Sequence, residues 1–366
     1  MDFPTAYPKI IERLHAIDPI QYGKTRNFID GAVTYLSPYI SRGVVSASQV
    51  IEIVLQQGHP LKHIEKLVQE LAWREYFQRV WQNMGAAILQ DIRQPQPDVL
   101  HHQFPKQIEN ATTGISALDQ HIQNLYDTGY MHNHVRMYTA SMVCNMAKAH
   151  WLQPSRWLYY HLLDGDIASN TCSWQWVAGS FSAKKYYCNQ ENINLFTKTD
   201  QQHTFLGVAH EVLPSLPVPP ALRETKELIL STTLPTSKEV ILNPSLPLLI
   251  YNSYNLDPQW RKELKANRIL VLEPSHFKAH PVSQKVIDFI LHLAENIDDI
   301  QLYVGEIVDI PHLKVFPSIH SKDHPAFTHY PGIKDALSWM FPSAKATGSF
   351  SEFWKSCQKQ GLPQTN

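Results

Sequence analysis

The sequence is poor in cysteine, in net charge and in long hydrophobic runs, and each shortage excludes a class of protein. It has only four cysteines, and their wide spacing does not suit a zinc site, an iron–sulfur cluster or a disulfide framework. No run approaches the roughly 20 apolar residues of a membrane span, and the N-terminus lacks the basic and apolar regions of a signal peptide. We therefore expect reduced structural thiols, no metal, no membrane and a cytoplasmic location.

The charge balance excludes a strongly basic nucleic-acid-binding protein. The chain has 32 Lys and Arg against 33 Asp and Glu, and residues 1–200 carry 17 of each kind. Bulk charge therefore provides no attraction for a phosphate backbone. Any surface that binds nucleic acid must be a local patch.

The hydrophobic pattern predicts an α + α/β protein with two domains, as the length of 366 residues also favours. Residues 1–204 read as all-helical, with helices at 7–16, 46–57, 62–84 and 116–126. Seven prolines mark 205–247 as a linker. In 248–366, apolar runs at 248–252, 268–272, 300–304 and 313–316, with a helix at 281–295, predict a small parallel α/β domain. Two closing helices are expected at 332–340 and 350–358.

The stretch 161–176, HLLDGDIASNTCSWQW, has the highest density of functional groups. Asp164 and Asp166 flank a glycine, so the backbone can turn tightly while both carboxylates reach one site. Asn170 follows, and Trp174 and Trp176 offer large π-systems for stacking or electron transfer. The structural alternative is a surface acidic turn followed by core tryptophans.

A second mixed group lies in the segment ELAWREYF. Glu70, Trp73 and Arg74 share one helix face, which a purely structural face would rarely combine. The alternative is a Glu70–Arg74 ion pair beside a core tryptophan. Further along the chain, Arg136 is a candidate partner for an acid of the Asp-Gly-Asp turn, because a buried guanidinium requires one; the alternative is an ordinary exposed arginine.

The loop 31–43, GAVTYLSPYISRG, combines hydroxyl groups with flanking glycines. Its Thr34, Ser37 and Ser41 hydroxyls and its exposed amides could hold phosphate oxygens. Loops of this composition are common, so the loop alone is a weak indication.

Four motifs, LSPYISRG, ELAWREYF, TGYMHNHVRM and DGDIASNTCSWQW, together resemble the FAD-binding helical domain of the DNA photolyase and cryptochrome family over residues 25–190. In that family an α/β antenna domain precedes the helical domain, whereas here an α/β domain follows it. The resemblance implies bound FAD. It assigns the cofactor to Thr34, Leu36, Ser37, Arg74, Asn133, Arg136, Asp164, Asp166 and Asn170.

The resemblance also implies individual roles. Arg136 and Asp164 would pair beside the flavin ring, and Asn170 would lie at its N5 atom. Trp174 and Trp151 would carry electrons to the flavin, while Ile108 stands at the position of the family's outermost tryptophan. The residues expected to bind a flipped-out lesion are Glu70, Trp73, Tyr130, Met137, Trp176, Lys184 and Lys185, and those expected to be catalytic are Glu70, Trp73, Met137 and Asn170.

The leading hypothesis is a light-dependent DNA repair flavoprotein, a deoxyribodipyrimidine photolyase-like lyase, that splits cyclobutane pyrimidine dimers by electron transfer from excited reduced FAD. Its partner would be UV-damaged DNA, single strands included, because extruding a lesion costs less there. One alternative is a cryptochrome-like blue-light or redox sensor without repair activity. Another is a nucleic-acid-binding module that kept only the scaffold. The sequence does not identify an antenna pigment, an oligomeric state or protein partners.

Overall fold

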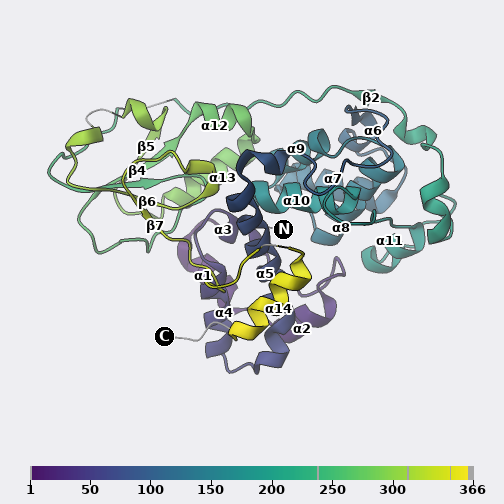
Figure 1. Ribbon diagram of the computed structural model, residues 1–366, viewed down its shortest axis with the longest axis horizontal. Coiled ribbons are helices and arrows are strands. Elements are labelled where there is room, and N and C mark those ends of the chain that lie inside the picture. The colour runs from purple at the N-terminus through teal and green to yellow at the C-terminus, as the bar shows by residue number, and fades with distance from the viewer. Residues whose placement is uncertain (1, 237–238, 311–312, 347, 362–366) are drawn as a thin grey trace. The chain divides into compact units, whose positions relative to one another are not determined.

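The computed structural model describes residues 2–236, 239–310, 313–346 and 348–361. The chain forms two compact units that alternate along the sequence (Figure 1). The sheet unit comprises Met1–Ile17, Thr34–Tyr76 and Ser231–Asn366, and the helical unit comprises Asp18–Val33 and Phe77–Leu230. The predicted division into 1–204, a linker and 248–366 stays a prediction; its outer ends, Met1 and residues 362–366, lie outside the described residues.

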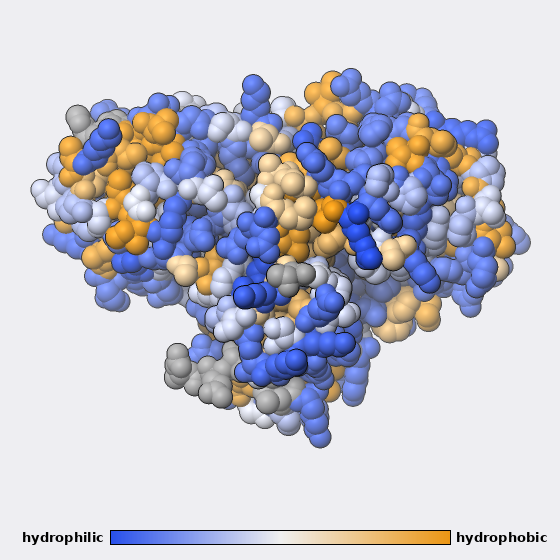
Figure 2. All heavy atoms as spheres, viewed as in Figure 1, coloured by the Kyte–Doolittle hydropathy of each residue, from blue (hydrophilic) through white to orange (hydrophobic). Residues whose placement is uncertain are grey.

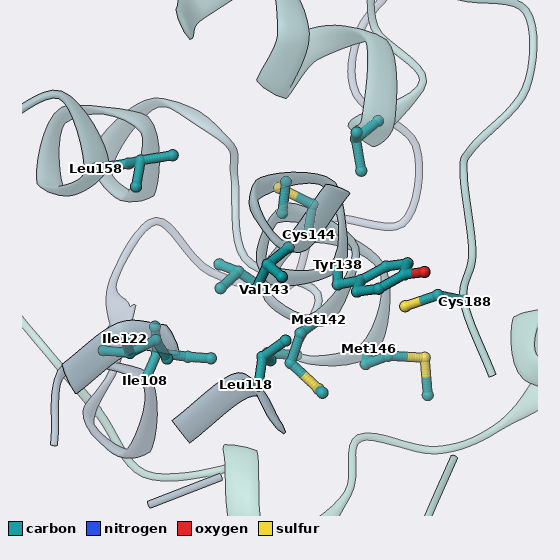
Figure 3. Close-up of a cluster of buried hydrophobic side chains, with 14 of the residues drawn as sticks. Ile108, Leu118, Ile122, Tyr138, Met142, Val143, Cys144, Met146, Leu158 and Cys188 are labelled. Atoms are coloured by element: carbon teal, nitrogen blue, oxygen red, sulfur yellow. The ribbon is translucent and has the colours of Figure 1, made fainter. Parts of the chain in front are cut away.

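The helical unit is built from short helices around one apolar core. Its elements are α2 (Pro19–Thr25), η1 (Gly85–Leu89), α6 (Lys106–Glu109), α7 (Ser116–Thr128), α8 (Asn133–Ser141), the π-helical turn η2 (Met142–Met146), α9 (Leu152–His161), α10 (Ile167–Ala178), α11 (Gln190–Thr197), η3 (His210–Ser215) and η4 (Pro220–Leu222). Two residues of β1 (Phe104–Pro105) pair antiparallel with β2 (Thr225–Lys226). The helical unit therefore contains a short two-stranded sheet that the sequence did not predict. Side chains of Leu118, Ile122 and Val143 meet in the core (Figure 3).

Part of the predicted linker contributes to this core. Leu206, Leu213 and Leu222 are fully buried in the same apolar cluster, and Thr225 hydrogen-bonds with its side chain to Gln103. The prolines of this stretch interrupt regular helix, but the stretch packs on the core and is not only a linker.

Helix ends agree with the local signals in the sequence. α4 (Ala47–Gln56) begins after Ser46, whose side chain forms a reciprocal capping box with Gln49. α7 ends at Gly129, which takes the left-handed conformation at φ 72°. α1 (Tyr7–His15) and α5 (Leu61–Met84) also lie where the apolar spacing predicts helices. α5 runs through the division at Tyr76.

The sheet unit contains a five-stranded parallel sheet, which confirms the predicted α/β character. The strands are β3 (Leu248–Tyr251), β4 (Asn267–Leu272), β5 (Ile300–Val304), β6 (Ile319–Lys322) and β7 (Ile333–Asp335), in the order β5-β4-β3-β6-β7. The helices that follow β4 are α12 (Pro274–Ala279) and α13 (Gln284–Ala294), and η5 (Ile307–Asp309), η6 (Leu313–Val315), η7 (Pro325–Phe327) and α14 (Phe350–Gln360) come later in the chain.

Two predicted elements are wrong. In the predicted strand 313–316, Leu313–Val315 form the 3-10 turn η6 instead. Leu313 and Phe316, three residues apart, both pack on the apolar cluster of the sheet, and a 3-10 turn aligns that spacing. Residues 332–340 contain strand β7 instead of a helix, because Ile333 pairs with His320 of β6.

The N-terminal segments of the sheet unit are fastened to its C-terminal part. Tyr39, in α3 (Ser37–Ser41), packs against Phe289 of α13 with ring centroids 6.0 Å apart, and the Tyr7 amide donates to Asn296 Oδ1 at 2.7 Å. These contacts explain why residues from the start of the chain cluster with the sheet.

The outer surface is mostly hydrophilic, with apolar residues scattered among the polar ones on the face in Figure 2. Within the described ranges, no helix combines the length and apolar character that crossing a membrane would require. All four cysteines are free and buried, as expected of structural thiols.

Candidate functional site

The Asp-Gly-Asp turn is fixed by hydrogen bonds within the helical unit. Asp166 is the N-cap of α10: its Oδ1 accepts from the Ser169 amide at 2.7 Å, and its Oδ2 accepts from the Gln78 side chain. A Cβ atom at Gly165 would lie 3.0 Å from the Leu162 carbonyl oxygen, so a side chain there would crowd the turn. Asp166 therefore orders the start of α10, whatever else it does.

Arg136 and Asp164 form the ion pair that the sequence predicts. Arg136 Nη2 lies 2.9 Å from Asp164 Oδ2, and the Asp164 side chain is only 5% exposed. Arg136 Nε donates to the Met131 carbonyl oxygen at 2.7 Å, and the guanidinium lies 5.6 Å from the centroid of the Tyr130 ring. Three contacts thus fix one planar cation beside a buried carboxylate.

Asn170 joins two helices of this unit. Its Nδ2 donates to the Ser155 carbonyl oxygen of α9 at 2.8 Å, which fixes the orientation of the amide and leaves its carbonyl oxygen facing away from that bond. Asn133 is exposed at the first position of α8, and Met137 is half-buried one turn later.

The tryptophans proposed for electron transfer are core residues. Trp151 is fully buried and its Nε1 donates to Asp91 Oδ1 at 2.6 Å, and Trp174 is 2% exposed. Ile108, at the position of the family's outermost tryptophan, packs with Leu118 and Ile122 (Figure 3). That position has an apolar packing role here.

Residues predicted to bind DNA differ in accessibility. Trp176 is 37% exposed, with Tyr186 at 5.9 Å between ring centroids, and Lys184 is exposed. Lys185 instead pairs with Asp98 at 2.8 Å, and this bond lowers the pKa of the Asp98 carboxyl. Of the two lysines, Lys184 is the better placed to meet a phosphate.

Two histidines of the helical unit are held neutral by burial. Burial lowers the pKa of His132 to about 4, with further lowering by His134, and also lowers the pKa of His161 to about 4. His132 also caps α8, since its Nδ1 accepts from the His134 amide at 3.2 Å. No group of three or more His, Cys, Asp or Glu suited to hold a metal ion occurs in the part of the chain that is described.

The predicted phosphate loop belongs to the sheet unit from Thr34 onward and is partly helical. Thr34 Oγ1 accepts from the Leu36 amide at 3.4 Å, and Leu36 is 1% exposed. Ser37 is exposed and begins the five-residue helix α3, which the sequence did not predict. Because its side chain is buried, Leu36 can contact a ligand only through its backbone.

The aromatic face of α5 is covered in a way that the sequence did not predict. Trp73 stacks on Phe350 of α14, with ring centroids 3.5 Å apart and an interplanar angle of 11°. Tyr76 lies 5.5 Å from Phe353 and donates to the Gly348 carbonyl oxygen at 2.6 Å. One face of the Trp73 indole is therefore occupied by the protein's own C-terminal helix.

Glu75 secures the segment that leads to α14. Its Oε2 accepts from the Met340 amide at 2.7 Å and its Oε1 from the Phe341 amide at 3.3 Å. Glu75 is 5% exposed, so this carboxylate is satisfied by the chain itself. Glu70 and Arg74, on the same helix, are half-buried.

Comparisons with known proteins agree with the resemblance indicated by the motifs. Residues 67–216 match the model of the FAD binding domain of DNA photolyase. A deoxyribodipyrimidine photo-lyase of Streptomyces griseus is 31% identical over 151 residues, which cover 41% of this chain and 32% of that protein. One from Synechococcus is 28% identical over 174 residues, covering 43% and 35%. The chain thus spans about a third of the length of these relatives.

Two solved structures are similar to part of this chain: a cryptochrome of Synechocystis and a class III photolyase of Agrobacterium tumefaciens. Each is 23% identical; the TM-scores are 0.49 and 0.43, and the matches cover 54% and 52% of this chain and 44% of each of those chains.

The match to the model of the photolyase FAD binding domain covers residues 67–216. This segment contains the Arg136–Asp164 pair, Asp166 and Asn170, but not the loop with Thr34, Leu36 and Ser37. The predicted cofactor contacts of that loop remain predictions.

Proposed function

We propose that this protein is a light-dependent DNA repair flavoprotein that splits cyclobutane pyrimidine dimers with an electron from excited reduced FAD. The observation that carries the proposal is the buried Arg136–Asp164 ion pair, with Asn170 nearby in sequence, inside the segment that matches the photolyase FAD-binding domain. The relatives that share this segment are deoxyribodipyrimidine photo-lyases.

The side chains of the helical unit suit a flavin by their chemistry. Arg136 provides a cation whose position is fixed by Asp164 and the Met131 carbonyl oxygen. Asn170 offers a neutral amide with its donor group already held by Ser155. Because Asp164 balances the charge of Arg136, these groups can orient a polar heteroaromatic ring without adding net charge. When bound and reduced, FAD would supply the electron that opens the dimer on illumination.

The substrate role falls to aromatic and polar groups at accessible positions. Trp176 is exposed and would stack on an extruded base, and Lys184 would meet a phosphate. Glu70 would hydrogen-bond a base edge. Trp73 can offer a lesion only the indole face opposite Phe350, or both faces once Phe350 has moved.

The direct test illuminates the purified, chemically reduced protein with an oligonucleotide that contains a thymine dimer, and follows the recovery of thymine absorbance. We expect recovery in the light only, and its loss in Glu70→Ala. Glu52→Ala, the same change at an exposed position of α4, serves as the matched control and should repair normally. A protein that binds FAD but repairs no dimer contradicts the proposal.

A sensor without repair activity is the second candidate, and the stack of Phe350 on Trp73 favours it. A helix that occupies a predicted substrate surface suits a protein whose output passes through its C-terminal segment. A sensor would change the protection of α14 against hydrogen exchange on illumination while leaving thymine dimers intact. Repair with α14 unaltered by light would exclude it.

A further inference from the structure

The sheet unit contains a group of buried polar residues, at the ends of its strands, that the proposed function does not use. The chain begins the sheet at β3, adds β4 and β5 on one side, and then adds β6 and β7 on the other. In open parallel sheets, ligands bind beyond the carboxyl ends of the strands where this winding reverses. Here these strands are β3 and β6.

The segment after β3 is polar, buried and incompletely hydrogen-bonded. Asn252, Ser253 and Asn255 are 1%, 3% and 2% exposed, and Ser321 of β6, the neighbour of Ile250, is fully buried. Among the described residues, no hydrogen-bond partner is found for Asn252 Nδ2, Ser253 Oγ, Ser321 Oγ or either polar atom of the Asn255 amide. Burying a polar atom without a hydrogen-bond partner destabilises the fold, so their concentration at two strand ends points to a polar ligand.

The orientation of one amide is fixed by the backbone. Asn252 Oδ1 accepts from the Tyr254 amide at 2.9 Å, which leaves Nδ2 as the group that can donate to a ligand. Asn255 has both its donor and its acceptor available. It therefore suits a ligand edge with one donor and one acceptor side by side, as nucleobases have.

Aromatic and basic groups lie at the same strand ends. Tyr254 stacks on His324, which follows β6, with ring centroids 4.4 Å apart, and His276 of α12 lies 6.3 Å from the Tyr254 ring. Arg42 lies 5.6 Å from that ring and donates to the Ser253 carbonyl oxygen at 3.4 Å. These rings suit a planar heterocycle, and the Arg42 guanidinium favours an anionic group. Burial lowers the pKa of His276, so its neutral imidazole contributes a ring and no charge.

The carboxylate in this region is already engaged. Glu273, directly after β4, accepts from His329 Nε2 at 2.9 Å and from the Ile307 amide at 3.0 Å. Its negative charge is thus directed to a histidine and a backbone amide.

We propose that the carboxyl ends of β3 and β6 form a binding site for a nucleoside monophosphate. The Asn255 amide would read the base edge, Ser253 and Ser321 would add hydrogen bonds, and Arg42 would attract the phosphate. The residues of this site lie outside residues 67–216, the segment that matches the FAD-binding-domain model.

The test is calorimetric titration of the FAD-loaded, full-length protein with AMP, GMP, CMP and UMP, and separately with inorganic phosphate. We expect at least one nucleotide to bind, and Asn255→Leu to weaken that nucleotide at least tenfold without changing the affinity for inorganic phosphate. Gln259→Leu, the matched change at an exposed position four residues later, should bind as the wild type does.

Binding of none of the four nucleotides, wild-type affinity in Asn255→Leu, or equal affinity for inorganic phosphate overturns the proposal. Thermal melting of each variant separates lost binding from lost folding. If Asn255→Leu does not fold, Ser321→Ala, which removes a single hydroxyl group, takes its place with the same expected loss. A protein purified without FAD would contradict the proposed function only, since Asn255→Leu still distinguishes this site from an empty flavin site.

Discussion

The predicted cofactor residues of the helical unit and the predicted substrate residue Trp73 of the sheet unit differ in what surrounds them. Around the Asp-Gly-Asp turn, two pairs of partners lie within 30 residues of each other: Arg136 and Asp164 are 28 residues apart, and Asn170 and Ser155 are 15 apart. Gln78, which donates to Asp166, is 88 residues away. Trp73 instead stacks on Phe350, which lies far along the chain. Motifs identify the polar residues of such a turn, but they do not indicate which distant segment covers an aromatic face.

The largest expected effect is on the ion pair. Arg136→Gln leaves the buried Asp164 carboxylate without its cation, which should cost about 3–5 kcal/mol in the free energy of unfolding and abolish retention of FAD. Urea unfolding and the flavin absorbance of the purified protein measure the two effects. The exposed Arg223→Gln is the matched control and should change neither.

The double variant Arg136→Gln/Asp164→Asn removes both charges and sharpens the result. If the loss in Arg136→Gln comes from an uncompensated carboxylate, the double variant should recover a large part of the stability. Stability equal to that of Arg136→Gln would mean that the contact with the Met131 carbonyl oxygen, and not the ion pair, holds this turn together.

The next effect concerns the covered face of α5. Phe350→Ala removes a side chain that is 8% exposed and should destabilise the packing of α14 by about 3 kcal/mol. Hydrogen exchange of α14 should accelerate. If Trp73 binds the lesion and α14 hinders it, affinity for dimer-containing DNA should rise at the same time.

Lys355→Ala, at an exposed position of the same helix, controls for helix propensity and should leave α14 protected. Faster exchange of α14 with unchanged DNA affinity would show that Trp73 is a packing residue. The covered face of α5 would then be part of the protein core, and only the region around the Asp-Gly-Asp turn would remain a candidate site.

Much of the fold follows from local pattern, and the errors show where it does not. The helices around 62–84 and 116–126 and three of the strands have apolar spacing that their neighbours in space reinforce. Strand β7 was missed because residues 332–340 have helix-like spacing, while its parallel pairing with β6 and the bonds of Asp335 to Arg261 and Trp260 decide the conformation.

The candidate site was predictable to a similar degree. An acid-rich turn and an arginine predict that Arg136 pairs with an acid of the Asp-Gly-Asp turn, and the family resemblance selects Asp164 as that acid. The stack of Phe350 on Trp73 and the polar strand ends at Asn252 and Asn255 depend on pairings between distant segments, which no local spacing reveals. The polar segment NSYN directly after an apolar run was the available signal for the strand ends.

The next, smaller effect is the pH dependence of stability that His161 gives the helical unit. Burial lowers the pKa of His161 from 6.5 to about 4. Between these values the unfolded chain binds a proton that the folded one does not, so the free energy of unfolding should fall as the pH drops from 6.5 to 4. The contribution of His161 is no more than about 3 kcal/mol.

Hydrogen exchange of α9 at several pH values measures this loss locally. His161→Phe, which keeps the ring contacts to Tyr126 and Trp157, should flatten the pH dependence. Tyr160→Phe changes a neighbouring ring and should keep the wild-type slope. An equal slope in His161→Phe would assign the acid sensitivity to other groups, with His132 the next to test.

The smallest expected effect tests the position of Asn170 relative to the flavin. Asn170→Asp replaces a neutral amide by a carboxylate and removes the donor to Ser155. A negative charge close to the flavin opposes its reduction, so the two-electron potential should fall by ~30 mV, equivalent to roughly 1.4 kcal/mol. Spectroelectrochemical titration of the FAD-loaded protein gives the potential.

Asn110→Asp, the same change at an exposed position of the helical unit, is the control. A potential unchanged in both variants would place Asn170 away from the flavin and leave its bond to Ser155, which joins α9 and α10, as its whole role.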